Sequence, residues 1–250
     1  MVLLHVKDAH SDRRRGHGIA GAKVAFCSRK PNGLEAELRA LRGDDTALWV
    51  ACDVSKEDQI ESLITTVVSR WGKIDCLLNN AGWHPPPKTI DEFSTQDLRD
   101  LFQLNFVSYF LACKLALPHL RKTKGNIINM SSWVGAHGQS EATTYTATKG
   151  AITAFSKGLA IDEAKAGVRV NVISPGNIWT PLWKSWSDGE ADPEAAVKSG
   201  DTVQPLDGGR KGTIAESGRL ALAIAADLTF TTGVDHIQSG GAELGYGVKA

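Results

Sequence analysis

The chain has 250 residues, 42% of them apolar, and its 28 lysines and arginines balance its 28 aspartates and glutamates. This length and apolar content suffice for one sizeable core, and the zero net charge excludes a global attraction to nucleic acid or to an anionic membrane. The opening stretch Met1-Val-Leu-Leu-His-Val is too short for a signal peptide or a membrane span, so we expect a soluble, cytoplasmic protein.

Cysteine usage agrees with a cytoplasmic location. The four cysteines are scattered, form no CxxC pair and lack the spacing of metal ligands. Most of them lie within apolar runs. We therefore expect reduced core residues and no metal site, the residues being Cys27, Cys52, Cys76 and Cys113.

Short apolar runs alternate with longer helical patterns, which favours a parallel sheet covered by helices. The expected strands are residues 23–27, 47–52, 74–78, 126–130, 168–173 and 233–237. The expected helices are residues 34–41, 55–71, 95–120, 142–166 and 214–226, the second opened by a capping box of Ser55 and Asp58. Residues 180–203, with three tryptophans in or beside them, are expected to form a substrate lid. The pattern predicts one α/β domain over residues 1–250.

Ser132, Tyr145 and Lys149 carry the clearest chemical signal. Tyr145 and Lys149 stand at i and i+4, so on a helix they share one face, one turn apart. A neighbouring ammonium favours phenolate, and a tyrosine, which titrates near ~10, needs such help to act as acid or base at neutral pH. The Ser132 hydroxyl could hold a carbonyl or alcohol oxygen. The three residues predict an acid/base site for hydride transfer, and the alternative is an ordinary surface pair.

Polar residues also follow the expected strands, where open α/β sheets bind ligands. In Asn79-Asn80-Ala81-Gly82 the asparagines could brace neighbouring strands and Gly82 could let a ligand approach, although a plain Asx turn is the alternative. Asp53 could accept a hydrogen bond from an adenine amino group or simply cap its loop.

Two further positions fit a ligand site. Asn105 lies in an apolar helical run and needs partners if buried, either a backbone carbonyl reached through water or a proton path. Pro175-Gly176 offers a rigid turn after a strand, followed by the Thr180 hydroxyl.

The order and spacing of these motifs resemble the short-chain dehydrogenase/reductase family over residues 21–250. Longer strings at residues 82–87, 114–118, 174–183 and 240–247 are similar to the type 14 17β-hydroxysteroid dehydrogenases within that family. The resemblance implies a Rossmann-like, doubly wound parallel sheet. The motifs that carry it are Asp53-Val54, Asn79-Asn80-Ala81-Gly82, Asn105, Ser132, Tyr145-x-x-x-Lys149 and Pro175-Gly176.

The resemblance also implies catalytic roles. Tyr145 would exchange the proton with the substrate oxygen, and Lys149 would lower the Tyr145 pKa and bind the nicotinamide ribose. Ser132 would orient the substrate oxygen, while Asn105 would hold a water that links Lys149 to solvent. The implied cofactor contacts, beyond Tyr145 and Lys149, are Asp53, Val54, Asn79, Ala81, Gly82, Pro175, Gly176, Ile178 and Thr180.

By the same resemblance the substrate would be a small-molecule ketone or hydroxysteroid such as estradiol, and the protein a homotetramer. Broad-specificity carbonyl reduction is an alternative activity. The implied substrate residues are His84, Gln139 and Trp183, with Trp179, Trp186 and the partner-reaching Tyr246 as further candidates.

The cofactor type is not fixed by the sequence. NAD-using members place an acidic residue after the second strand to accept from the ribose 2′-hydroxyl. This chain has Ser28-Arg29-Lys30 there, without an acid and with two cations. NAD follows from the resemblance, whereas Ser28 and Arg29 would suit NADP.

The first 20 residues depart from the family pattern. They contain a literal GxGxxG (Gly16, Gly18, Gly21), but it runs directly into the strand at residue 23 and leaves no room for the helix that such a motif requires. We expect an atypical or truncated first β-α unit, with Arg13-Arg14-Arg15 as a solvated loop or a set of phosphate-binding charges. Two explanations stay open: an aberrant N-terminal segment on an otherwise ordinary enzyme, or a non-catalytic relative that acts as an oligomerising or binding protein.

Overall fold

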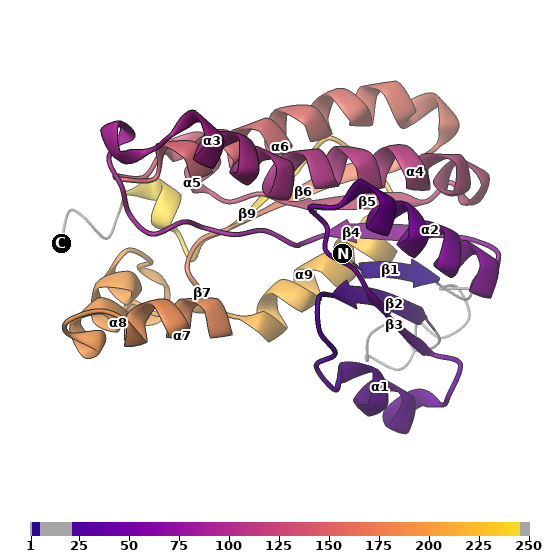
Figure 1. The fold of residues 1–250 in the computed structure, drawn as a ribbon, viewed down its shortest axis with the longest axis horizontal. Helices are drawn as coiled ribbons and strands as arrows, with labels where there is room; N and C mark the ends of the chain where they lie inside the picture. Colours follow the sequence, from indigo (N-terminus) through magenta and orange to yellow (C-terminus); the bar gives the residue numbers. More distant parts are fainter. Residues whose placement is uncertain (1, 6–21, 246–250) are drawn as a thin grey trace.

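A seven-stranded sheet runs through the computed structural model, which describes residues 2–5 and 22–245 (Figure 1). Its strand order, β3-β2-β1-β4-β5-β6-β9, is that of a doubly wound dinucleotide-binding sheet. The strands are β1 (Val2–His5), β2 (Lys23–Ser28), β3 (Ala47–Ala51), β4 (Cys76–Asn79), β5 (Asn126–Met130), β6 (Arg169–Pro175) and β9 (Asp235–Gln238). A small parallel pair, β7 (Ile178–Trp179) and β8 (Gly212–Thr213), lies apart from this sheet.

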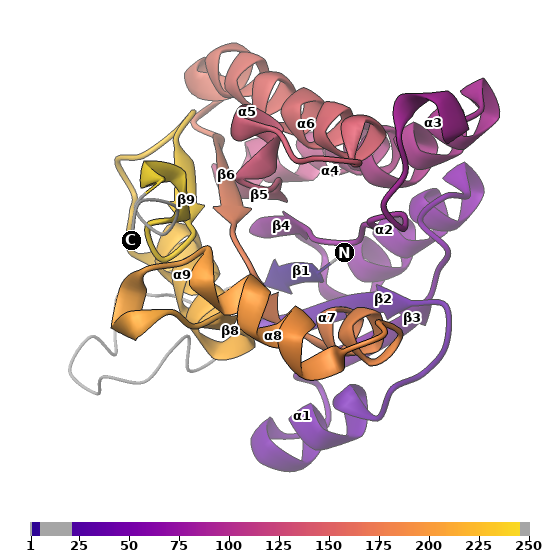
Figure 2. The same ribbon diagram turned by 90° about the vertical axis from the view of Figure 1, so that its left-hand side faces the viewer.

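Helices cover both faces of the sheet, as Figures 1 and 2 show. One face carries α2 (Glu57–Trp71), α4 (Ser108–Thr123) and α6 (Thr143–Glu163), and the other carries α1 (Leu34–Arg42) and α9 (Ile214–Ala226). The shorter helices are α3 (Thr95–Phe102), α5 (Val134–His137), α7 (Pro181–Asp188) and α8 (Pro193–Thr202). The segment predicted as a lid, residues 180–203, thus forms α7 and α8.

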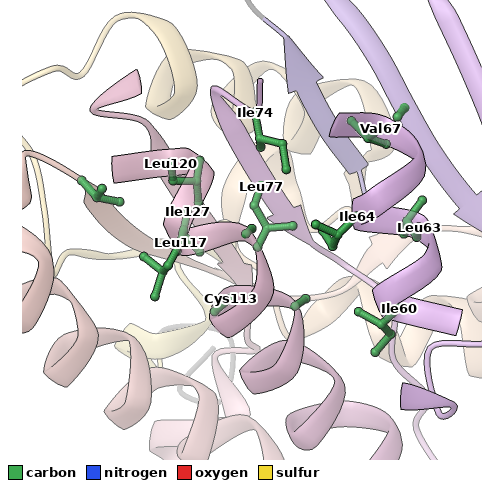
Figure 3. Close-up of a cluster of buried hydrophobic side chains, with 14 of the residues drawn as sticks. Ile60, Leu63, Ile64, Val67, Ile74, Leu77, Cys113, Leu117, Leu120 and Ile127 are labelled. Atoms are coloured by element: carbon green, nitrogen blue, oxygen red, sulfur yellow. The ribbon is translucent and has the colours of Figure 1, made fainter. Parts of the chain in front are cut away.

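The central strands are apolar on both sides because each side meets a helix layer. Leu77 and Ile127 join the core cluster under α2 and α4, while Cys76 and Ile128 pack with Ile224 of α9 on the opposite face. Each fully buried side chain of this kind contributes about 1.5–3 kcal/mol. Figure 3 shows the larger cluster, in which α2 and α4 converge on β4 and β5 through Ile60, Leu63, Ile64, Val67, Ile74, Leu77, Cys113, Leu117, Leu120 and Ile127.

Most of the predicted helices and strands are confirmed. Two predictions about helices are corrected. The helix predicted at residues 95–120 is interrupted by a π-helical turn, Gln103–Val107, between α3 and α4. The predicted capping box is also wrong: α2 begins after Lys56, and the Ser55 hydroxyl donates to Asp53 Oδ1 at 2.8 Å. The Asp53 carboxylate also accepts from the Ser55 backbone, so a local Asx turn takes the hydroxyl away from the helix end.

The helical run Thr95–Thr123 has the length and mean hydropathy (1.3) of a membrane span by composition alone. It lies in the helix layer over the sheet, and 44% of its apolar window is buried inside the fold. Buried residues such as Ala112 and Leu120 belong to the core cluster described above. The apolar character of this run is therefore accounted for by core packing.

Strand β1, which is not among the predicted strands, is the antiparallel member of an otherwise parallel sheet. It pairs antiparallel with both neighbours, so that Val2 lies opposite Phe26 of β2 and Leu78 of β4, while the other six strands are mutually parallel. Its reversed direction departs from the β-α unit that would place a parallel strand here, and the predicted atypical first unit is confirmed.

Several sequence predictions lie outside the described residues. They are the three arginines Arg13-Arg14-Arg15, the glycines Gly16, Gly18 and Gly21, and the C-terminal Tyr246.

We predict that Leu3→Pro destabilises the protein by about 2–3 kcal/mol. Proline has no N–H to donate, so one ladder bond in the middle of the sheet is lost and a buried carbonyl is left without its partner. The midpoint of guanidinium unfolding, followed by circular dichroism, measures the effect. Leu3→Val, which keeps the N–H, is the control, and equal midpoints for the two variants would contradict the central position of β1.

Candidate active site

A cavity of about 720 Å³ opens where β4, β5 and β6 end. The loops after these three strands contribute Gly82, Ser132 and Gly176, and helix α6 contributes Tyr145 and Lys149. Since parallel strands present their carboxyl ends at one edge, sequence-distant motifs meet there. A hollow of similar volume, about 700 Å³, on the exposed side of α2 contains none of the predicted site residues.

Tyr145 and Ser132 face each other in this cavity. Ser132 Oγ donates to the Pro175 carbonyl at 3.4 Å. Burial raises the pKa of Tyr145 to about 12, and the neighbouring Ser132 hydroxyl opposes this rise only in part. At neutral pH the group is therefore a neutral phenol that can donate a proton.

Lys149 lies one helical turn behind Tyr145, as the i, i+4 spacing predicts. It is only 5% exposed, and its Nζ donates to the Met130 carbonyl at 2.9 Å. Nζ lies 5.7 Å from the centre of the Tyr145 ring. Burial lowers the pKa of Lys149 to about 8.

The predicted lowering of the Tyr145 pKa by Lys149 is absent from this arrangement, in which that pKa is raised. Two causes act together. The Lys149 ammonium is directed to the Met130 carbonyl rather than to the phenol oxygen, and burial penalises the charged form of both groups.

Asn105 is completely buried in the π-helical turn, a type of helix distortion that is frequent at functional sites. Its Nδ2 donates to the Trp83 carbonyl at 2.9 Å and to Thr148 Oγ1 at 3.2 Å, while its Oδ1 accepts from the Trp83 N–H at 2.9 Å. The amide thus bonds the loop after β4 directly, without an intervening water. Its predicted role in holding a water beside Lys149 stays a prediction.

His84 and Gln139 form the polar wall of the cavity. The His84 ring lies 4.2 Å from the Tyr145 ring, its Nδ1 lies 2.6 Å from the Pro85 carbonyl, and its Nε2 lies 3.4 Å from Gln139 Oε1. Because a carbonyl only accepts, Nδ1 donates to Pro85, and Nε2 can then accept from Gln139 when the amide is turned to present its N–H in place of its oxygen. A hydroxyl that enters beside Tyr145 would find both a histidine nitrogen and an amide within the same wall.

Tryptophans form the opposite, apolar wall. Trp183 and Trp186 of α7 line the cavity, and their rings meet edge to face at 4.7 Å. Trp179 is 40% exposed and does not line the cavity, and its predicted substrate contact stays a prediction.

The predicted cofactor residues divide into two groups. Gly82, Pro175, Gly176, Ile178 and Thr180 line the cavity. At Gly82 an added Cβ would stand 3.4 Å from Asn105 Oδ1 and 3.6 Å from Lys149 Nζ, so the absence of a side chain keeps this corner open. Thr180 Oγ1 accepts from the Trp183 N–H at 3.2 Å and so caps α7.

The second group builds the framework around the cavity. Asn79 Nδ2 donates to Asn129 Oδ1 at 2.9 Å and so braces β4 against β5, as predicted. Val54 is buried in the core, and Ala81 packs against it. Asp53 holds Ser55 in the loop described above, and hydrogen bonds from Ser55 lower the pKa of its carboxyl.

The positions predicted to choose between NAD and NADP lie at the end of β2. Ser28 Oγ accepts from the Trp49 indole N–H at 2.9 Å and donates to the Lys30 carbonyl, whereas Arg29 is exposed. Because the Ser28 hydroxyl is bonded within the fold, Arg29 is the more accessible of the two for a phosphate. Among the residues that the structure describes, no group of histidine, cysteine, aspartate or glutamate side chains could hold a metal ion.

Comparison with known proteins agrees with this geometry. The profile of the family described as short chain dehydrogenase matches residues 16–191, which is more than half of the chain. The chain belongs to the short-chain dehydrogenase family. The L-fucose dehydrogenase of Rattus norvegicus is 50% identical over 231 residues, covering 92% of this chain and 84% of that protein.

Solved structures support the same assignment. The crystal structure of Cj0485 dehydrogenase has a TM-score of 0.81 and 31% identity, and the match covers 87% of this chain and 83% of that one. L-sorbose reductase from Gluconobacter frateurii, solved with NADPH and L-sorbose, has a TM-score of 0.80 and 25% identity, with 86% and 85% covered. The family prediction is confirmed, while the closer likeness to type 14 17β-hydroxysteroid dehydrogenases stays a prediction.

The described residues fit the nicotinamide end of NAD(P). Gly82 leaves an opening in front of Lys149, and Gly176 and Thr180 line the same cavity. At the diphosphate end the family's strand-to-helix turn cannot follow β1, because β1 runs away from this edge.

Sequence reasoning missed one buried charge beside the cavity. Lys211 lies under the Trp183 ring and is 6% exposed. It directly follows Arg210 in a glycine-rich stretch, a composition typical of a solvated loop. No signal in the local sequence indicates its burial, which α8 provides.

We predict that burial of Lys149 makes stability rise with pH. Between pH ~8 and ~10.5 the unfolded chain binds a proton that the folded chain has released, so the free energy of unfolding increases with pH. Relative to Lys149→Met, the wild-type chain should gain about 3 kcal/mol across this range. Chemical denaturation at several pH values measures the difference, and a difference that stays constant with pH would contradict the burial of a titrating ammonium.

Proposed function

We propose that this protein is an NAD(P)-dependent oxidoreductase that interconverts a hydroxyl and a carbonyl of a small sugar of the L-fucose type. The observation that carries the proposal is the joint presence of Ser132, Tyr145 and Lys149 in one cavity, with the His84 ring in tilted contact with that of Tyr145. The sugar class is supported by 50% identity with an L-fucose dehydrogenase and by similarity to an L-sorbose reductase.

In the reducing direction Tyr145 donates its phenolic proton to the carbonyl oxygen of the substrate, while the carbon of that carbonyl accepts a hydride. Ser132 donates a hydrogen bond to the same oxygen and fixes its place. Both acts stabilise the charge that develops on the oxygen, as preorganised donors do in general. In the oxidising direction the same groups act in reverse, and the alcohol proton returns to Tyr145.

The nicotinamide supplies or accepts the hydride when the cofactor is bound. Lys149 would hold its ribose, Gly82 and Gly176 would let it approach the backbone, and Ile178 and Thr180 would border its ring. NAD and NADP both remain within the proposal, and Arg29 favours NADP because its guanidinium can pair with a 2′-phosphate.

His84 and Gln139 support a substrate with more than one hydroxyl. Both stand beside the phenol, so a second hydroxyl next to the reacting carbon would meet a histidine nitrogen and an amide. A hydroxysteroid such as estradiol is the second candidate, supported by the apolar wall of Trp183 and Trp186. The expected homotetramer and cytoplasmic location stay predictions.

Tyr145→Phe should lower the rate of L-fucose oxidation by about 10²–10⁴-fold, because the phenyl ring cannot accept or donate the proton. The assay follows the absorbance of reduced nicotinamide at roughly 340 nm. NAD and NADP are tested separately. The exposed Lys184→Met is the control. An unchanged rate in Tyr145→Phe would show that another group moves the proton.

His84→Phe separates the two substrate classes. Phenylalanine keeps the ring contact with Tyr145 but loses the ring nitrogens, so kcat/KM for L-fucose should fall by about 10–100-fold, the effect of one or two lost polar contacts. Activity on estradiol, which has no neighbouring hydroxyl to bind, should change by less than about threefold. A selective loss with estradiol would overturn the sugar assignment in favour of the steroid.

A further inference from the structure

Lys211 is a buried lysine between the lid helices and the small parallel pair β7–β8. Its side chain is only 4% exposed. Its Nζ donates to the Val197 carbonyl at 2.6 Å and to Asp201 Oδ1 at 2.9 Å, and its backbone N–H donates to the same Asp201 oxygen at 3.1 Å. All three bonds end on α8, so this lysine ties the start of β8 to the second lid helix.

The ammonium of Lys211 also faces an aromatic ring. Nζ lies 4.1 Å from the centre of the Trp183 ring and 5.7 Å from that of Trp179. Both distances are within the range of a cation–π contact, and burial of the lysine strengthens that contact because little water competes for the charge. The charge of Lys211 therefore holds the Trp183 ring in place by electrostatic attraction.

Gly200 of α8 packs against the Trp183 ring. A Cβ at this position would stand 2.5 Å from Cη2 of Trp183 and 3.0 Å from Cε of Lys211. The ring thus occupies space that any other residue at position 200 would fill. Trp186 meets the same ring edge-on at 4.7 Å. Trp183 is enclosed by α7, α8 and Lys211, and its orientation is fixed by all three.

We propose that Lys211 is a positioning residue that sets the substrate wall of the cavity through Trp183. Trp183 lines the cavity, whereas Lys211 does not, so the effect of the lysine on substrate is transmitted by the ring. An apolar side chain of similar length would avoid the desolvation cost of a buried charge, but it could not bind Asp201, Val197 and the ring face together. The inference rests on the proposed function for its substrate and deepens it.

Lys211→Met tests this role, because methionine keeps the length of the side chain and removes the charge. KM for L-fucose should rise about tenfold, as expected for loss of one desolvated cation–π contact, while kcat stays within about twofold. Lys211→Arg, which keeps the cation, should recover most of the loss. Lys184→Met on α7, whose side chain is 62% exposed, removes a lid charge away from the cavity and should leave KM unchanged.

Gly200→Ala approaches the same ring from the other side. Alanine favours a helix more than glycine does, so the variant should still fold, while its Cβ displaces the Trp183 ring and raises KM in the manner of Lys211→Met. A merely structural role for Lys211 predicts instead that KM follows the thermal midpoint across the set of variants. That correlation would overturn the proposal.

Tryptophan emission gives a readout that does not depend on turnover. Lys211→Met should shift the emission of the free protein, and most of the shift should vanish in a Trp183→Phe background, because the Trp183 ring lies 4.1 Å from the charge and the Trp179 ring 5.7 Å. If wild-type protein fails to oxidise L-fucose but the Trp183-dependent shift occurs, the proposed substrate is wrong and the positioning role holds. If the shift is absent, or persists in full without Trp183, the positioning role is wrong whatever the substrate.

Discussion

A series of buried hydrogen bonds joins β4, β5 and α6, and the geometry of the site depends on it. Asn79 donates to Asn129, and Asn129 donates to Ser156 of α6, each at 2.9 Å. The same helix is tied to the end of β5 where Ser131 Oγ donates to the Lys149 carbonyl at 2.8 Å. Buried polar groups without partners are costly, so the helix cannot slide along the sheet without breaking several of these bonds.

The position of α6 buries Tyr145 and Lys149, and burial reverses the order of their pKa values. A free lysine is slightly more basic than a free tyrosine. In the folded chain the pKa of Tyr145 is about 12 and that of Lys149 about 8, so at neutral pH the phenol keeps its proton. The proton that the proposed reaction needs is thus held by Tyr145 in the cavity, and Lys149 is the first of the two groups to release its proton as the pH rises.

The sequence alone predicted the features that follow from the periodicity of its side chains, such as shared helix faces and buried strands. Tyr145 and Lys149 had to share a helix face, and a strand such as β4 had to be buried because Cys76, Leu77 and Leu78 place apolar side chains on both of its faces. Periodicity does not distinguish a parallel strand from an antiparallel one, so the direction of β1 could not be predicted. The π-helical turn around Asn105 shifts hydrogen bonds without changing the residue pattern, and the burial of Lys211 depends on a helix that approaches from elsewhere in the chain.

Strand β1 also determines how the sheet holds together. Among the strands that the structure describes, it alone connects β3-β2 to β4-β5-β6-β9 by backbone pairing, so four residues form the seam between the two parts. Ladder bonds involve main-chain atoms, which every residue except proline provides in full. The seam therefore demands an extended segment rather than a particular sequence, and many unrelated leading segments could close it. Sheet integrity and dinucleotide recognition, which one β-α unit normally supplies together, are thus separable properties in this fold.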